Sequence, residues 1–189
     1  MAKGSVIFWT LILMTSDMPI VNWQKRCTRF RCPVYRRNRA NVAAWMVDME
    51  RFFELVVFNY IYANGDAHLK NFALLKHPEG YRLSPAYDLL NTALHVDGDD
   101  FVLDGGLSPD IEKTDAYANT GHPCRVDFER FACNIGLLPS RTKRILDKYA
   151  TLSTDANTLI GNSFLNEKMK RSYLRIVKER ISRFNRISD

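Results

Sequence analysis

The chain has 189 residues, of which 46% are hydrophobic and 25% are charged. This length is typical of one domain with a sizeable core, and this composition argues against global disorder. The formal net charge of +6 is compatible with a polyanionic partner, although charge alone indicates only solubility and non-specific association.

The first 41 residues form an atypical basic segment, which we expect to be poorly ordered, ahead of a domain over residues 42–189. The apolar run VIFWTLILM at 6–14 is far shorter than the roughly 20 residues of a membrane helix, so it predicts a buried strand or helix. No signal-peptide cleavage pattern follows it, which leaves secretion as a minority hypothesis. Residues 25–39 are rich in Lys and Arg and contain no acidic residue, which is typical of a loop or mobile arm.

The four cysteines form no C-x-x-C pair and have no nearby pair of histidines. Zinc ligation and a disulfide framework are therefore not expected, and a cytoplasmic protein without membrane association fits best. These residues are Cys27, Cys32, Cys124 and Cys133.

A helix is predicted from about Val42 to Ala63, because apolar residues recur there at intervals of three and four. We expect Asn64 and Gly65 to end it, since both residue types tolerate the left-handed conformation. The apolar positions are Trp45, Met49, Phe52, Phe53, Val56, Val57, Tyr60 and Ile61.

The polar stretch NGDAHLKN, residues 64–71, begins where this helix ends. Next, FALLK and YRLSP flank HPEG, which predicts a short hairpin with Gly80 at positive φ. Asp88 follows the second strand, so the hairpin can return it to a position beside Asp66.

The rest of the chain is predicted to be helical after an acidic, glycine-containing connection over 97–115. Its loop HVDGDDF lacks the spacing and the final glutamate of an EF-hand, which favours a solvated turn. The segment VDFERFACNI predicts a helix ending at Gly136, and SRTKRILDKYATL predicts another with Ser140 as its cap. A basic amphipathic helix closes the chain.

Phosphoryl transfer requires a carboxylate that accepts the proton of the attacking hydroxyl, and oxygen ligands that hold magnesium against the phosphates. Asp66 is the candidate base, and Asn71 and Asp88 are the candidate magnesium ligands. Lys70 carries a compact positive charge suited to a phosphate oxygen, and His68 is a candidate for orienting the loop or contacting the nucleotide.

NGDAHLKNF followed by SPAYDLL resembles the catalytic segment of the HipA family of bacterial serine/threonine kinases, the toxins of certain toxin–antitoxin pairs. The resemblance implies a mainly helical kinase C-lobe, related to lipid kinases, with ATP and Mg²⁺ as cofactors. It makes Asp66 the catalytic base, Asn71 and Asp88 the magnesium ligands, and residues 68–71 a nucleotide contact, with Tyr87 lining the same site. A serine or threonine of a protein substrate would accept the phosphate, and a DNA-binding antitoxin would be a partner.

The resemblance runs from about Phe52 to the C-terminus, and the first 50 residues contain only Gly4, so they offer no glycine-rich phosphate loop. We therefore expect a truncated or rearranged kinase chain. It would be weakly active or inactive alone, unless a separately encoded N-lobe completes the nucleotide clamp.

Structural and non-kinase alternatives stay open. Asp66 can cap a helix, and Asp88 can be the N-cap ahead of LLNTAL. Residues 126–150 have the outline of a DNA-binding helix-turn-helix, although Ile145, Leu146 and Tyr149 occupy much of the second helix. The C-terminal helix can face a membrane or nucleic acid, or dock on the domain with its basic side in water, which we favour. An inactive interaction module is a further alternative.

Overall fold

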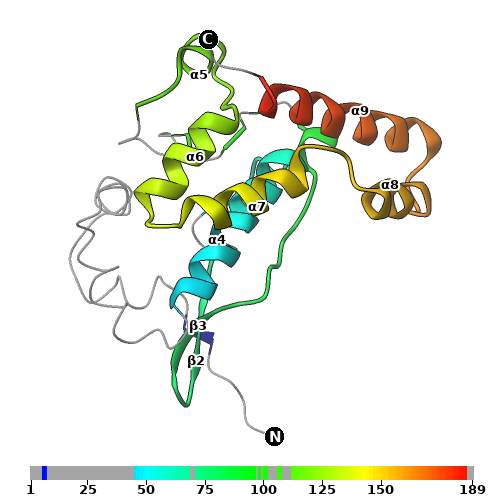
Figure 1. Cartoon of the computed structure of the whole chain (residues 1–189). Coiled ribbons are helices and arrows are strands. Elements are labelled where there is room, and N and C mark those ends of the chain that lie inside the picture. The colour runs from blue at the N-terminus through cyan, green and yellow to red at the C-terminus, as the bar shows by residue number, and fades with distance from the viewer. Residues whose placement is uncertain are drawn as a thin grey trace, which may run out of the picture.

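The computed structural model describes residues 6–7, 45–68, 71–96, 98, 100–101, 106–107 and 112–186. Helices dominate this part of the chain, and a small antiparallel sheet lies at one end of it (Figure 1). The predicted fold class, mainly helical with a small β-hairpin, is therefore confirmed. The elements are β1 (Val6–Ile7), α4 (Trp45–Ile61), β2 (Leu74–His77), β3 (Gly80–Leu83), η2 (Thr92–Leu94), α5 (Asp115–Thr120), α6 (Arg125–Asn134), α7 (Pro139–Tyr149), α8 (Thr154–Gly161) and α9 (Glu167–Phe184).

The predicted first helix is observed as α4, which ends at Ile61, two residues earlier than expected. Its start at Val42 lies outside the described residues. The predicted apolar face is confirmed, because Met49, Phe53, Val57 and Tyr60 are all buried. The core thus forms along one side of this helix.

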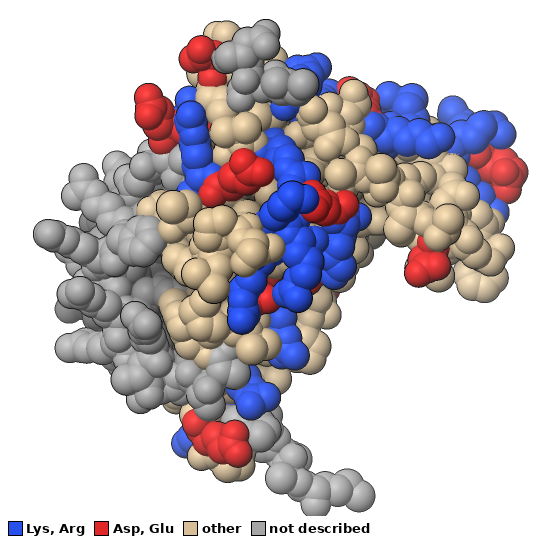
Figure 2. Space-filling view, in the orientation of Figure 1, with Lys and Arg blue, Asp and Glu red and all other residues tan. Residues whose placement is uncertain are grey.

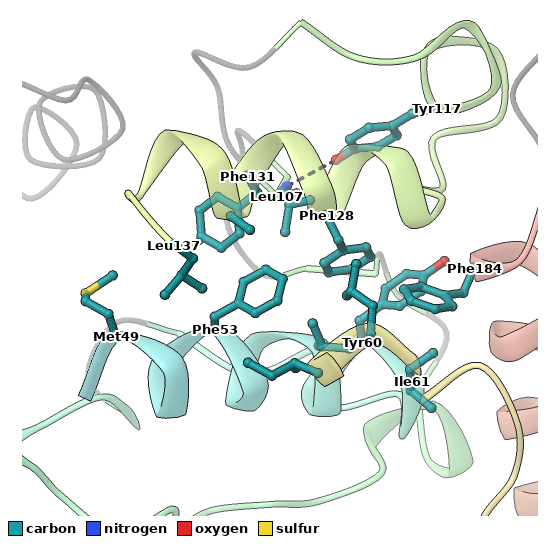
Figure 3. Close-up of a cluster of buried hydrophobic side chains, with 14 of the residues drawn as sticks. Met49, Phe53, Tyr60, Ile61, Leu107, Tyr117, Phe128, Phe131, Leu137 and Phe184 are labelled. Carbon is teal, nitrogen blue, oxygen red and sulfur yellow. Dashed lines mark hydrogen bonds between the residues drawn. The ribbon is translucent and has the colours of Figure 1, made fainter. Parts of the chain in front are cut away.

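Aromatic side chains of α6 and α9 pack on this face of α4 (Figure 3). The rings of Tyr60 and Phe128 have centroids 5.2 Å apart, and those of Phe128 and Phe184 are 5.6 Å apart. The Tyr60 hydroxyl donates to the carbonyl of Pro123 at 2.9 Å, so its polar end is satisfied within the core. Burial of a phenylalanine in such a cluster is worth about 3–5 kcal/mol relative to alanine. Aromatic packing therefore holds α6 and α9 against α4.

The predicted hairpin is confirmed: β2 and β3 pair antiparallel, with His77 opposite Gly80 and a positive φ of 126° at Gly80. A third strand, β1, pairs with β2 through Val6 and Ile7, which agrees with the strand interpretation of that part of the apolar run. The remainder of residues 1–41 lies outside the described residues. The backbone N–H of Leu83 donates to Oδ2 of the buried Asp48 at 3.0 Å, so α4 also fixes the hairpin.

Two short helices, α5 and α8, were not predicted separately, and one predicted cap is wrong. Helix α7 begins at Pro139 with Leu138 as its N-cap, so Ser140 lies inside the first turn. Proline is favoured in the first turn because its fixed φ suits a helix and it lacks the N–H that would be unpaired there. Helix α6 ends at Asn134, and Gly136 follows with φ 82°.

The C-terminal helix docks on the domain as expected, with Val177 and Phe184 buried. The expectation that all its basic residues face water is wrong for Arg180, which is only 7% exposed. Its guanidinium pairs with Asp100, also 7% exposed, and lies 5.2 Å from the centroid of the Tyr60 ring. Asp100 belongs to the loop expected to be a solvated turn, and Nδ1 of His122 lies 2.8 Å from its Oδ2. This part of the acidic connection is therefore anchored in the protein.

Among the described helices, none combines the length and the apolar character needed to cross a membrane. Cys124 is a buried free thiol and Cys133 an exposed one. Cys27 and Cys32 lie outside the described residues.

Candidate functional site

The polar stretch begins at the end of α4, where the backbone reverses at Ala63. Ala63 adopts the left-handed conformation, with φ 57°. The prediction that Asn64 or Gly65 would adopt it to end the helix is therefore wrong. This conformation costs roughly 1–2 kcal/mol in a residue with a Cβ. The backbone N–H and the hydroxyl of Thr92 both donate to the Ala63 carbonyl, at 3.1 and 3.2 Å, and these bonds offset part of that cost.

Asn64 is buried and links this reversal to the segment that carries Asp88. Its Nδ2 donates to Oδ1 of Asn59 at 3.1 Å and to the backbone carbonyl of Asp88 at 3.0 Å. The N–H of Gly65 donates to the Thr92 hydroxyl at 2.9 Å, which adds a second link between the two segments. Sequence reasoning missed these roles of Asn59, Asn64 and Thr92, because it treated the Asn-Gly pair only as a helix stop.

Asn71 and Asp88 lie in direct contact. Nδ2 of Asn71 donates to Oδ2 of Asp88 at 2.6 Å, and Oδ1 of Asn71 accepts from the N–H of His68 at 3.0 Å. The His68 N–H fixes which end of the carboxamide is the oxygen, since a backbone amide only donates. The two predicted magnesium ligands are therefore neighbours, and the loop that precedes β2 meets the segment that follows β3.

His68 and Tyr87 lie next to these residues in the chain. The Nδ1 atom of His68 is buried and has no hydrogen-bond partner within the part of the chain that the structure describes. Partial burial, and secondarily the charge of the adjacent Asp88, raise the pKa of Tyr87 above its ordinary value. Tyr87 is therefore a neutral phenol at physiological pH.

Asp66 lies on the exposed turn between Asn64 and His68. Its backbone carbonyl accepts from the N–H of His68 at 2.8 Å, whereas its carboxylate makes no hydrogen bond or ion pair with a described residue. The carboxylate is thus available to a ligand. The predicted phosphate contact Lys70 lies outside the described residues.

The contacts do not support the alternative in which Asp66 and Asp88 only cap helices. Asn91, not Asp88, caps the 3₁₀ helix η2, with its Oδ1 accepting from the N–H of Leu94 at 3.2 Å. Asp88 instead has φ 57° and exposes its side chain. A residue in this strained conformation outside a cap is often held there for function.

Asn71 and Asp88 carry oxygen atoms of the kind that a hard divalent cation prefers, and the Asn71 atom that faces Asp88 in this structure is Nδ2, while Oδ1 faces the His68 N–H. A carbonyl oxygen has two lone pairs and a carboxylate about four, so both side chains retain acceptor capacity beyond the hydrogen bonds described above. Within the described residues, no group of three or more His, Cys, Asp and Glu could hold a metal ion. Magnesium is commonly bound by one or two protein ligands together with substrate phosphates and waters, and the residues present fit that mode.

The basic side chains of α7, which a DNA-binding helix would turn toward the phosphates of a duplex, are paired with carboxylates. Arg141 and Arg144 both pair with Glu50, and Lys148 pairs with Glu54 at 2.6 Å. Lys143 pairs with Asp147 in the next turn of α7 at 2.6 Å. Figure 2 shows basic and acidic side chains next to one another on the face that carries α7. This surface is less available to phosphates than the sequence suggests.

Comparison with known proteins finds a match of residues 33–156 to the family model of the HipA-like C-terminal domain. Two similar proteins of Sinorhizobium fredii carry the names "Putative kinase Y4dM" and "Putative kinase Y4mE". The first is 44% identical over 55 residues, covering 28% of this chain and 13% of its own length. The second is 38% identical over 50 residues, covering 26% of this chain and 12% of its own length.

A solved complex of HipA, HipB and operator DNA from a Shewanella oneidensis MR-1 toxin–antitoxin system is also similar. The identity is 19% and the TM-score 0.37, with 87% of this chain and 34% of the other covered. This chain thus spans well under two thirds of the length of each of these relatives.

Proposed function

Because this chain belongs to the family of the HipA-like C-terminal domain, we propose that it carries the metal- and base-bearing part of an ATP-dependent serine/threonine protein kinase site. The observation that carries the proposal is the 2.6 Å contact between Asn71 and Asp88 beside the loop of Asp66. It brings an amide and a carboxylate from two segments together, as a phosphate-bound cation requires.

Each side chain has a distinct role in this proposal. Asp66 accepts the proton of the attacking hydroxyl, a role that its unpaired, exposed carboxylate permits. Asn71 and Asp88 hold Mg²⁺, which when bound neutralises negative charge on the phosphates.

Three further side chains face the nucleotide in this proposal. His68 offers its buried, unpartnered Nδ1 on the phosphate side of the site, together with Lys70. Tyr87 lines the nucleotide pocket as a neutral phenol, because its pKa is raised.

We further propose that phosphate transfer by these residues is weak unless a phosphate-covering loop completes the site. The reason is energetic, because each charge-assisted phosphate contact contributes roughly 1.5–3 kcal/mol of binding. A protein with a Ser or Thr acceptor and a DNA-binding antitoxin are the partners that the family suggests.

The test is a titration of the full chain with ATP at several Mg²⁺ concentrations, followed by a phosphate-transfer assay. The proposal expects magnesium-dependent binding that disappears in the presence of a chelator. Binding that is absent, or that is indifferent to magnesium, would support the inactive interaction module instead. Micromolar affinity of the chain alone would contradict the proposed need for a phosphate-covering loop.

A further inference from the structure

Asn64 connects two parts of the protein through a single side-chain nitrogen. Its Nδ2 reaches Oδ1 of Asn59 on α4 and the backbone carbonyl of Asp88, at 3.1 and 3.0 Å. A backbone carbonyl only accepts, so the Asn64 atom that faces it is the amide donor. Asn64 and Asn59 are 5% and 4% exposed, and these hydrogen bonds are therefore shielded from competing water.

Asp88 needs such support because its backbone is in the left-handed region, with φ 57°. The direction of the Asp88 side chain depends on this φ, because a change to an ordinary extended φ rotates the Cα–Cβ bond relative to the chain. The Asn64 bond fixes the Asp88 carbonyl, and the Asn71 bond fixes its carboxylate. Of these two bonds, only the one from Asn64 acts on the backbone.

We propose that Asn64 is a positioning residue, which holds the Asp88 backbone in the conformation that directs its carboxylate toward Asn71. As far as catalysis is concerned, this inference rests on the proposed function, in which Asp88 and Asn71 bind Mg²⁺. Residues that orient metal ligands without touching the metal typically change metal affinity 10–100-fold when they are replaced.

Asn64 can be replaced without releasing the whole loop, because Thr92 provides independent links. Its hydroxyl accepts from Gly65, and its backbone N–H donates to Ala63. In Asn64→Asp the shape is kept but the donor is lost, and a carboxylate then faces two oxygen acceptors. Asn64→Ala removes the donor without introducing this repulsion, and it serves as the second variant if Asn64→Asp does not fold.

A matched control lies at the far end of the domain. Asn185 also uses Nδ2 to bond the backbone carbonyl of a distant residue, Ala150, at 2.7 Å. Asn185→Asp removes the same type of hydrogen bond by the same chemical change, and no hydrogen bond of Asn185 reaches the site loop within the described residues. Asn185 is exposed whereas Asn64 is buried, so this variant controls for the chemical change itself and not for the loss of a buried hydrogen bond.

The experiment has two readouts on the full chain. The first is the Mg²⁺ concentration that gives half of the maximal ATP binding, and we expect it to rise about tenfold in Asn64→Asp and Asn64→Ala and to stay unchanged in Asn185→Asp. The second is the side-chain NH₂ resonance of Asn71 in an ¹⁵N NMR spectrum without ligand, assigned by its loss in Asn71→Asp. We expect this resonance to shift in both Asn64 variants and not in the control.

The two readouts separate the positioning role from the proposed function. If folded Asn64 variants keep the wild-type Asn71 resonance, the positioning role is wrong, whatever their activity. If the resonance shifts while the wild-type chain shows no magnesium-dependent ATP binding, Asn64 does position Asp88 and the kinase proposal fails. An unchanged magnesium requirement in variants whose resonance does shift would refute the link to metal binding.

Discussion

The Asn71 side-chain amide donates a 2.6 Å hydrogen bond to Oδ2 of Asp88, across seventeen residues of sequence. The hairpin between these residues makes the contact possible. At its base the N–H of Ser84 donates to the carbonyl of Ala73 at 2.8 Å, so the chain that leaves β3 returns beside the loop that enters β2. A short local element thus places a carboxylate beside an amide.

Replacement of Asp88 by asparagine tests the metal role with little change in structure. Asparagine tolerates the left-handed conformation, and it can still accept the hydrogen bond from Asn71. It lacks the negative charge, however, and a neutral amide is a poorer ligand for magnesium. We expect magnesium-dependent ATP binding to weaken at least about tenfold, as measured by calorimetry.

Asp155→Asn is the control for this loss of charge, because Asp155 is an exposed residue in the first turn of α8. Its ATP binding should equal that of the wild type. Wild-type affinity in Asp88→Asn at limiting magnesium would remove Asp88 from the metal site.

Replacement of Asp66 by alanine should separate binding from chemistry. The Asp66 carboxylate is exposed and makes no bond to a described residue, so its removal should change the free energy of unfolding by less than about 0.5 kcal/mol. A general base contributes about 10²–10⁴-fold to a reaction rate. We therefore expect phosphate transfer to fall by that factor while the ATP dissociation constant stays the same.

Radiolabelled phosphate incorporation and calorimetry on the same preparation check both expectations for Asp66. A variant that transfers phosphate at the wild-type rate would exclude Asp66 as the base. A parallel loss of ATP affinity would instead assign Asp66 to nucleotide binding.

Features set by local sequence were predicted well. The buried face of α4 follows from the spacing of its apolar residues, and the hairpin follows from a glycine between two apolar runs. The same hairpin was predicted to return Asp88 beside Asp66, and the structure shows Asp88 in contact with Asn71, which follows Asp66 in the same polar stretch. In each case the deciding interactions lie within a few turns or within one strand pair.

Features set by distant contacts were missed. Nothing in the sequence around Arg180 distinguishes it from the exposed arginines of α9, because its partner Asp100 is eighty residues away. The roles of Asn64 were hidden for a similar reason, since its acceptor in Asp88 is identified only once the hairpin has folded. Asn-Gly is also a strong turn signal, which favoured the simpler interpretation.

The buried pair of Asp100 and Arg180 should contribute strongly to stability when only one partner is removed. Both side chains are almost fully buried, so Asp100→Asn leaves Arg180 without its carboxylate, and Arg180→Met leaves Asp100 with His122 alone. Such a change costs about 3–5 kcal/mol, whereas replacement of both partners is often much less costly. Urea unfolding of the two single variants and the double variant measures these terms.

We expect the double variant to be more stable than the sum of the two single losses predicts. Arg175→Met is a suitable control on the same helix, because its side chain is 71% exposed in its pair with Glu179. Additive losses in the double variant would show that the two charges do not depend on each other.

The ion pairs between α4 and α7 yield a prediction about nucleic acid. Glu50 pairs with Arg141 and Arg144, and Glu54 pairs with Lys148. We therefore expect the wild-type chain to bind a DNA duplex only weakly, and Glu50→Gln with Glu54→Gln to strengthen binding by freeing three cations. Each phosphate contact adds about 0.9 to the slope of log affinity against log salt, so the slope should steepen by up to roughly 3.

Fluorescence anisotropy at several salt concentrations measures this slope. Unfolding experiments should show a loss of about 0.2–1 kcal/mol for the pair of Glu54 with the exposed Lys148, and a larger loss for Glu50, whose side chain is only 14% exposed. Glu129→Gln, which removes one of the two carboxylate partners of Arg125 on α6, controls for the loss of one of the two negative charges. The opposite result would be a wild-type chain that binds duplex tightly, with a steep salt slope that the Glu50 and Glu54 changes do not alter. The cations of α7 would then be available despite their carboxylate partners, and the DNA-binding alternative would be restored.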